Sequence, residues 1–313
     1  MAKTTSNSIS VKELIDKKVT NDKRYVEKII PVILFLLATV SILTTVGIVL
    51  TLVFDASQFF RQVSFLDFFF SVDLDPLSRN DPSFGILPLI TGTIVSSAIA
   101  MCVAIPIGLT AAIFLSEYAS EKVRKTIKPL MEVLAGIPTI VYGFFAYSFV
   151  TPLLLNIIPD LGAKNVLSPG IVMGIMIIPM VASLSEDAMS SVPNALREGA
   201  VALGATKLEV SLKVIVPAAI SGIIASFVLG ISRAIGETMI VTIASGSSKN
   251  FTLDITESMQ TMTAYIVEFT SGDAGAGTVG YYSLYAVGLT LFVFTLGMNL
   301  LAQYISRKFR EEY

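Results

Sequence analysis

The sequence predicts an all-α integral membrane protein with six transmembrane helices and both termini in the cytoplasm. Three observations lead to this fold class. Hydrophobic residues make up 53% of the 313 residues and charged residues only 15%, which is too apolar for a soluble domain of this size. Six apolar segments have about the length that a helix needs to cross a hydrocarbon core of roughly 30 Å. Lys and Arg gather in alternate loops, as they do in oriented membrane proteins.

The six segments follow one another along the chain without a detectable repeat. We expect helices at residues 29–54, 85–115, 130–155, 170–184, 214–246 and 281–305. The first follows a polar tail and has no convincing cleavage site, so we interpret it as a retained anchor rather than a signal peptide. The fourth is short, but apolar neighbours from Leu167 through Asp187 can lengthen it.

The distribution of charge divides the chain and orients it. We expect the following parts: a cytoplasmic tail (1–28), the first helix (29–54), an extracytoplasmic loop (55–84), a membrane core (85–305) with a cytoplasmic loop at 186–217, and a cytoplasmic tail (306–313). Of the 22 Lys and Arg residues, 17 fall in the two tails and in the loops assigned to the cytoplasm. The outer loops are instead acid-rich, for example at Asp73 and Asp254, and we expect this face to meet a soluble protein.

The composition argues against metal binding, disulfide bonds and catalysis by this chain. There is no histidine and a single cysteine, Cys102, so we expect no metal site, no disulfide and no His-based acid or base. A Walker A loop needs a lysine after its second glycine, and the nearest match, Gly199 to Gly204, lacks it. We therefore expect no bound cofactor, no ATP hydrolysis by this chain, and no nucleic-acid partner.

Two outer segments have distinctive compositions. Residues 58–71 contain six phenylalanines among charges, and we expect a helix that lies in the membrane interface. Residues 271–280 are rich in glycine, but no strand precedes them and they include an acidic residue. We interpret them as an outer loop rather than a phosphate-binding nest.

The cytoplasmic loop carries helix start and stop signals. Pro193 suits the first turn of a helix, and Gly204 is placed to end that helix in the left-handed conformation. Thr206 and Glu209 then form a Thr-x-x-Glu capping box that starts a second helix. The predicted product is a compact helical projection that can insert into a partner's groove. On these signals alone, an ordinary loop between spans is an equal alternative.

Charged residues lie inside the fifth predicted span. Arg233 and Glu237 are four residues apart, so we expect them on one helix face, where they can neutralise each other. They form either a structural ion pair or an anion site in which Glu237 orients the Arg233 guanidinium. Counting from Pro217 at 1.5 Å per residue places Arg233 about 24 Å from the inner end, past the midplane. We favour the pathway role.

Other polar and small residues in the spans have structural interpretations. Small residues recur every four positions in the fifth span, as a stripe that another helix can approach closely: Gly222, Ser226, Gly230 and Ala234. Glu132, near the cytoplasmic end of the third span, is expected to reach the interface. Thr91 and Thr93 are expected to join helices rather than to bind a ligand.

The cytoplasmic loop resembles the EAA loop of ABC importer permeases. The matching residues are Glu198, Gly199, Ala200, Gly204 and Pro217. Gly199 replaces the usual first alanine, which weakens the helix by about 1 kcal/mol. In that family the loop docks into the ATPase subunit, so the resemblance implies that these five residues form the docking site.

Three further segments, at residues 84–93, 134–145 and 230–238, are similar to phosphate importer permeases of the PstC type. The resemblance runs from about Phe84 to Gln303. It implies a MetI-like permease core in spans two to six, transport of inorganic phosphate, and a role for Arg233 and Glu237 in its passage. The implied partners are a second permease of the PstA type, an ATPase dimer that binds ATP and Mg²⁺, an extracytoplasmic phosphate-binding protein, and membrane lipid.

Three alternatives remain open from the sequence. The chain could be a permease for another oxyanion, such as sulfate or molybdate, or belong to a different ABC importer. It could be an ion-coupled secondary transporter in which Arg233 and Glu237 form the coupling pair. It could also be a membrane sensor or scaffold, although it has no recognisable signalling domain.

Overall fold

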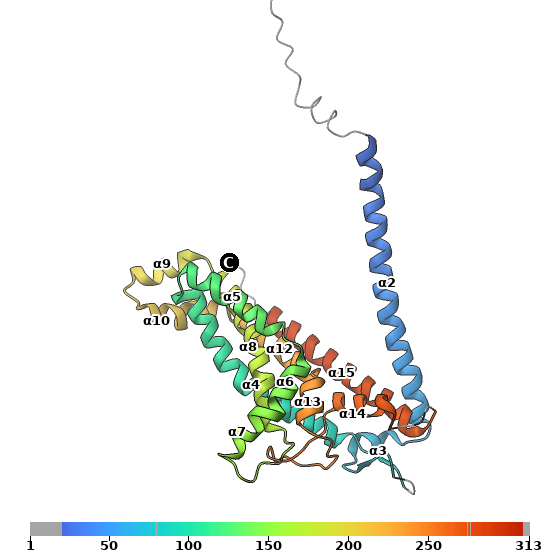
Figure 1. The fold of residues 1–313 in the computed structure, drawn as a ribbon. Helices are drawn as coiled ribbons and strands as arrows, with labels where there is room; N and C mark the ends of the chain where they lie inside the picture. The colour runs from blue at the N-terminus through green and yellow to red at the C-terminus, as the bar shows by residue number, and fades with distance from the viewer. Residues whose placement is uncertain (1–20, 79–80, 274, 276, 309–313) are drawn as a thin grey trace, which may run out of the picture. The chain divides into compact units, whose positions relative to one another are not determined.

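A computed structural model describes residues 21–78, 81–273, 275 and 277–308. Two short strands pair in antiparallel register, with Leu74 opposite Phe84. The other elements are helices or π-helical turns, the latter marked η (Figure 1). The chain forms two compact units, one up to Phe54 and one from Asp55 onward.

The elements in chain order are α2 (Asn21–Phe60), α3 (Phe65–Phe70), β1 (Leu74–Asp75), β2 (Ser83–Phe84), α4 (Leu87–Ile113), η1 (Phe114–Tyr118), α5 (Glu121–Ala135), α6 (Thr139–Phe145), η2 (Ala146–Val150), α7 (Thr151–Leu155), α8 (Leu167–Ser190), α9 (Asn194–Ala202), α10 (Lys207–Val210), η3 (Ser211–Ile215), α11 (Val216–Ala218), α12 (Ile220–Ile235), α13 (Met239–Ala244), α14 (Met262–Glu268), η4 (Phe269–Asp273) and α15 (Val279–Lys308).

Four of the described helices are long and apolar enough to cross a membrane unbroken. They span Ile29–Phe60, Leu87–Tyr118, Leu167–Ser190 and Val279–Ile305. The fourth predicted segment is therefore longer than the strict count, as expected. Two bent pairs raise the number to as many as six: α5 with α6–α7, bent by 83°, and α10–α11 with α12, bent by 73°. The count of six spans stays a prediction.

The bend in the third predicted segment has a local cause. Pro138 lacks a backbone N–H and disfavours helical geometry in the residue before it, so α5 ends at Ala135 and α6 begins at Thr139. The pair Gly136 and Pro138 thus lies at the bend of the segment. The arm before the bend, α5, buries none of its side chains within this chain.

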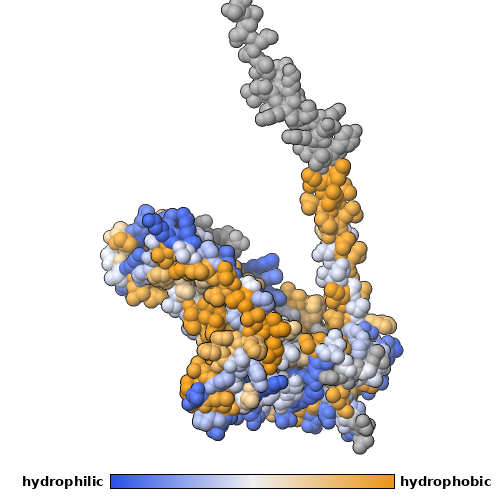
Figure 2. Space-filling view, in the orientation of Figure 1, coloured by the Kyte–Doolittle hydropathy of each residue, from blue (hydrophilic) through white to orange (hydrophobic). Residues whose placement is uncertain are grey.

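The core from Asp55 onward centres on α4, α8 and α12. Met173 and Ile177 of α8 are fully buried beside Ala100 and Ala104 of α4. The small-residue stripe of α12 packs on α8, as predicted, because a Cβ at Gly222 would overlap Ala188. Figure 2 shows hydrophobic side chains along the middle of this unit and hydrophilic ones toward the α9 end and the opposite end. That banding suits a bundle embedded in lipid.

The phenylalanine-rich segment differs from its prediction. Residues 58–71 do not form one helix, because α2 ends at Phe60 and the short α3 follows. Phe59 and Phe68 are fully buried, with ring centroids 5.3 Å apart in an edge-to-face arrangement. Phe59 also packs on Phe84 at 5.4 Å. These rings pack on one another in a second core cluster, whereas Phe65 and Phe70 are exposed. A place in the membrane interface stays a prediction.

Candidate functional site

A helical projection, residues 194–210, stands at one end of the bundle; we refer to it as the knob (Figure 1). Its first helix, α9, ends before Gly204, whose φ is +85°, the left-handed conformation that the sequence predicts. The capping box is also confirmed. The Thr206 N–H donates to Glu209 Oε2 at 3.1 Å, and the Glu209 N–H donates to Thr206 Oγ1 at 3.4 Å.

The capping box changes the acidity of its glutamate. The backbone N–H of Thr206 lowers the pKa of Glu209 to about 2, with help from Lys213, whose Nζ lies 3.1 Å from Glu209 Oε1, and from the Thr206 hydroxyl. Glu209 is therefore ionised at neutral pH, and its charge stays available to hold the start of α10.

The tip of the knob is apolar and unpaired within this chain. Leu203 is 90% exposed, and Val201 and Leu208 are more than half exposed. Of the five residues predicted to dock an ATPase, Glu198, Gly199, Gly204 and Pro217 are exposed, whereas Ala200 is half-buried against the core below the knob. Pro217 lies beyond the knob, in α11. A group of exposed apolar side chains such as Leu203, Val201 and Leu208 is typical of a surface that a partner covers.

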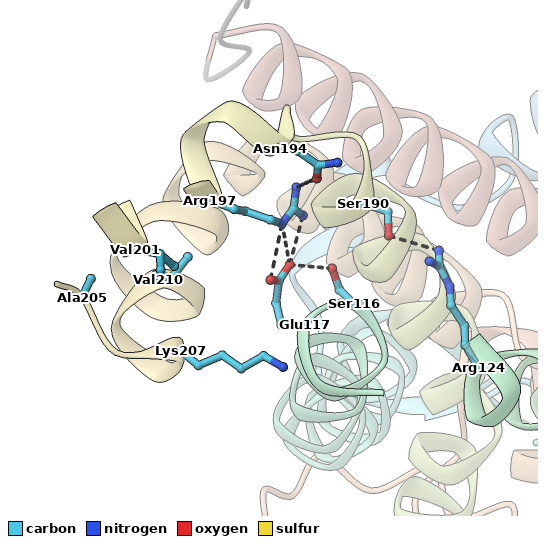
Figure 3. A pocket seen from close by; sticks show the side chains of 10 residues that line it. All are labelled: Ser116, Glu117, Arg124, Ser190, Asn194, Arg197, Val201, Ala205, Lys207 and Val210. Atoms are coloured by element: carbon cyan, nitrogen blue, oxygen red, sulfur yellow. Dashed lines mark hydrogen bonds and ion pairs between the residues drawn. The ribbon is translucent and has the colours of Figure 1, made fainter. Parts of the chain in front are cut away.

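At the base of the knob lies an arginine that sequence reasoning missed. Arg197 of α9 pairs with Glu117 of η1, with Nη2 and Oε1 3.0 Å apart (Figure 3). Its guanidinium also donates to the carbonyls of Met189 at 2.8 Å and Val192 at 2.6 Å, and to the Asn194 side chain at 3.2 Å. The group thus joins the ends of α4, α8 and α9 beside a cavity of about 640 Å³.

A buried carboxylate next to the knob was also missed. Glu186 of α8 is inaccessible to solvent and pairs with Arg124 and Lys128 of α5. Ser190 donates a hydrogen bond of 2.7 Å to Glu186, and Lys128 also pairs with Asp187 at 3.0 Å. These contacts hold α5 on α8. No local pattern reveals them, because the partners are about sixty residues apart.

The expected pairing of Arg233 with Glu237 is wrong. The helix ends at Ile235, so the two residues do not share a helix face. The Glu237 carboxylate instead accepts hydrogen bonds from the backbone N–H groups of Met239, at 3.0 Å, and Ile240, at 3.3 Å. The carboxylate binds these N–H groups at the start of α13 rather than the Arg233 guanidinium, because the N–H groups would otherwise be buried without hydrogen-bond partners.

Arg233 is left exposed in the last turn of α12. Within the described part of the chain, it makes no hydrogen bond or ion pair. It lines a cavity of about 420 Å³ between α5, α8 and α12. Lys128 and Glu132 of α5 line the same cavity as Arg233. We expected Glu132 to reach the membrane interface, and the structure places it at the wall of this cavity. An unpaired guanidinium at a cavity wall can bind an anion.

The threonines of the second span behave differently from each other. Thr93 is buried, and its hydroxyl accepts a hydrogen bond of 3.0 Å from the N–H of Met262, so it joins α4 to α14 as expected. Thr91 is half-buried.

Comparison with known proteins identifies the family. A family model described as "Binding-protein-dependent transport system inner membrane component" matches residues 104–311. The chain is 34% identical to "Probable ABC transporter permease protein YqgH" of Bacillus subtilis, with 79% of each chain covered. It is 33% identical to "Phosphate transport system permease protein PstC" of Xylella fastidiosa, covering 77% of this chain and 79% of that one. A probable PstC of Methanocaldococcus jannaschii is also 33% identical, over 73% of this chain and 77% of that one.

Solved structures share the fold. A bacterial ABC transporter involved in alginate import aligns with a TM-score of 0.59 at 17% identity, over 96% of this chain and 100% of that one. The methionine transporter MetNI aligns with a TM-score of 0.53 at 15% identity, over 72% of this chain and 95% of that one. These likenesses establish the MetI-like permease fold.

Family membership decides between the classes considered from the sequence. Its relatives are permease subunits of ABC transporters, so the chain is a transport subunit rather than an enzyme, and ATP hydrolysis resides in a separate subunit. The ion-coupled secondary transporter and the membrane sensor are not supported. The chain belongs to the family of inner membrane permease components of binding-protein-dependent ABC importers.

Proposed function

We propose that the chain is the PstC-type permease of an importer that carries inorganic phosphate across the cytoplasmic membrane. The observation that carries this proposal is the exposed, unpaired Arg233 guanidinium at the wall of a cavity. Its planar fork can donate two parallel hydrogen bonds to a tetrahedral oxyanion. The names of the relatives from Xylella fastidiosa and Methanocaldococcus jannaschii support phosphate as that anion.

The proposal places the chain with both termini in the cytoplasm and six spans, counting each bent pair as one. The core then covers residues 85–305, and the loop at 186–217 faces the cytoplasm. There the exposed tip of the knob, with Leu203 at its apex, docks an ATPase dimer that binds ATP and Mg²⁺. A second permease of the PstA type faces Arg233 and closes the path.

Delivery by a binding protein suits the charge of the outer face. The acidic outer loops repel free anions, but they offer a docking surface for a soluble partner that carries phosphate. ATP-driven closure of the ATPase pair then displaces the knob and opens the path toward the binding protein. Phosphate passes Arg233 on the way. Glu237 contributes by holding the break between α12 and α13 rather than by contacting the anion.

The test is uptake of labelled phosphate by the complete complex in liposomes. We expect Arg233→Gln to reduce uptake by about tenfold to hundredfold, because the substitution removes a charge-assisted hydrogen bond to the anion. Arg307→Gln, which removes an exposed arginine in the last turn of α15, away from the cavity and from the outer loops, is the matched control and should leave uptake unchanged. If Arg233→Gln transports normally in an assembled complex, Arg233 is not a ligand of the anion.

Another oxyanion is the second candidate, because sulfate and molybdate offer the same tetrahedral oxygens to Arg233. Stimulation of ATP hydrolysis by binding proteins loaded with phosphate, sulfate or molybdate separates them. Stimulation by sulfate or molybdate alone would contradict the phosphate proposal and leave the permease assignment intact.

A further inference from the structure

Both helices of the knob contact one short turn at the end of α4. This turn is η1, a π-helical turn that follows the last α-helical residue of α4. From α9, Arg197 pairs with Glu117 (Figure 3). From α10, Lys207 Nζ lies 5.0 Å from the centroid of the Tyr118 ring, within the range of a cation–π contact. Glu117 and Tyr118 are neighbours, so the two helices hold adjacent residues.

The Arg197 contact is well fixed. The Glu117 side chain is only 7% exposed and the Arg197 side chain 20% exposed, so water competes little for the pair. The remaining guanidinium hydrogens are donated to the Asn194 side chain and to the carbonyls of Met189 and Val192, which lie at and beyond the last turn of α8. Carbonyls at a helix end need such donors. Arg197 therefore cannot leave Glu117 without also disturbing the junction between α8 and the knob.

The contact between Arg197 and Glu117 joins two parts of the chain that are far apart in sequence. The backbone connects the knob to α8 on one side and to η3 and α11 on the other, whereas Glu117 is 80 residues away from Arg197 in sequence. The knob reaches the end of α4 only across space. A π-helical turn is less regular than an α-helix and is often found at functional sites. The cavity beside it, of about 640 Å³, leaves room for the turn to shift.

We propose that Arg197 and Glu117 are positioning residues that transmit movement of the knob to α4, and that η1 is the element that receives it. The proposal rests on ATPase docking to the knob. A displacement of α9 pulls Glu117 through the hydrogen bonds that Arg197 Nε and Nη2 donate to its carboxylate, and α10 acts on the same turn through Lys207. Loss of the pair uncouples α4 from the ATPase without removing the docking surface, which lies at the exposed tip.

The first test compares Glu117→Gln with Glu121→Gln in the reconstituted complex. Glu121 is four residues away and forms an exposed pair with Lys125, so its neutralisation is a matched control. For Glu117→Gln, we expect normal retention of the ATPase and normal basal hydrolysis, but about tenfold fewer anions transported per ATP. Arg197→Lys keeps the charge and loses the fork, and we expect an intermediate loss. Wild-type stoichiometry in both variants would overturn the proposal.

A second readout does not depend on the transported anion. Cys102, the only cysteine of the chain, lies midway along the α4 span with an exposed side chain, so a membrane-permeant maleimide reports its access to water. We expect its labelling rate to differ between the nucleotide-free complex and the complex trapped with ATP and vanadate, and this difference to disappear in Glu117→Gln but not in Glu121→Gln. If α4 labelling ignores nucleotide in the wild type, or if the difference persists in Glu117→Gln, the pair does not transmit movement. A different outcome is that nucleotide changes Cys102 labelling in the wild-type complex while phosphate-loaded binding protein fails to stimulate its ATP hydrolysis. That outcome would contradict the phosphate proposal and leave the role of Arg197 and Glu117 intact.

Discussion

The carboxylate of Glu237 accepts a hydrogen bond of 3.0 Å from the backbone N–H of Met239 and thereby caps the first turn of α13. The carbonyl of Glu237 in turn accepts a hydrogen bond of 2.7 Å from the hydroxyl of Thr263. Since Glu237 is only 8% exposed, both groups are held away from water. Glu237 therefore fixes the geometry of the break that leaves Arg233 at the end of α12.

This arrangement predicts different results for two substitutions of Glu237. Glu237→Gln retains an oxygen acceptor for the α13 amides, so we expect uptake within a few fold of wild type. Glu237→Ala leaves those amides without a partner, which costs about 1–2 kcal/mol and shifts Arg233. Uptake and thermal unfolding of the two variants check this. Equal damage from both would mean that the negative charge itself is needed.

Two glycines in helices should respond in opposite directions to alanine. In Gly222→Ala, the new methyl would overlap Ala188, so α8 and α12 must separate at a cost of about 1–3 kcal/mol. In Gly199→Ala, nothing lies within 4 Å of the new methyl, and α9 should gain about 0.5–1 kcal/mol. The unfolding temperatures of the permease complex measure both effects. A stable Gly222→Ala complex would contradict the close contact.

Neutralising Glu186 should destabilise the attachment of α5. Glu186→Gln leaves Arg124 and Lys128 next to each other without their buried counter-charge, although both cations are partly exposed and can recover water. We expect a loss of about 1–3 kcal/mol, seen as a lower unfolding temperature. Glu121→Gln, in an exposed pair, should change stability by less than about 0.5 kcal/mol. An equal effect of the two changes would argue against a structural role for the buried pair.

The capping box predicts how α10 depends on pH. The folded-state pKa of Glu209, about 2, is below its ordinary value of 4.5, so its contribution is complete above the ordinary value and is lost as the pH falls toward 2. Amide exchange in α10 should therefore be constant between about pH 5 and 8 after correction for the intrinsic rate. Thr206→Val should increase exchange throughout this range. A change in protection near neutral pH would show that another group holds the helix.

The features predicted well from the sequence are those that depend on neighbouring residues. Gly204 and the pair Thr206 and Glu209 specify a turn and a helix start within a few positions, so the shape of the knob follows from local chemistry. The stripe of small residues from Gly222 to Ala234 is likewise visible in the sequence, because its members recur every four positions. Docking of an ATPase on this knob remains a prediction.

The features that were missed depend on residues far apart in the sequence. Helical spacing alone puts Arg233 and Glu237 on one face, but the contact of Thr263 with the Glu237 backbone and the demand of the α13 amides end the helix between them. Arg197 and Glu117 are 80 residues apart in sequence, and they meet only because η1 at the end of α4 lies beside α9 in the fold. Pairs of this kind leave no local pattern. In a single sequence, a charged residue that forms a buried ion pair cannot be distinguished from one that lies on the surface in water.

The contact between α8 and α12 limits how the knob can respond to force. Ser185 and Ser226 share a buried hydrogen bond of 2.7 Å, and Gly222 lies against Ala188 on the same seam. The helix that enters the knob, α8, and the helix after the bend that follows the knob, α12, are therefore held together along this seam. Separating α8 from α12 would break the Ser185–Ser226 hydrogen bond and open the contact between Gly222 and Ala188, so we expect a displacement of the knob to move these two helices together.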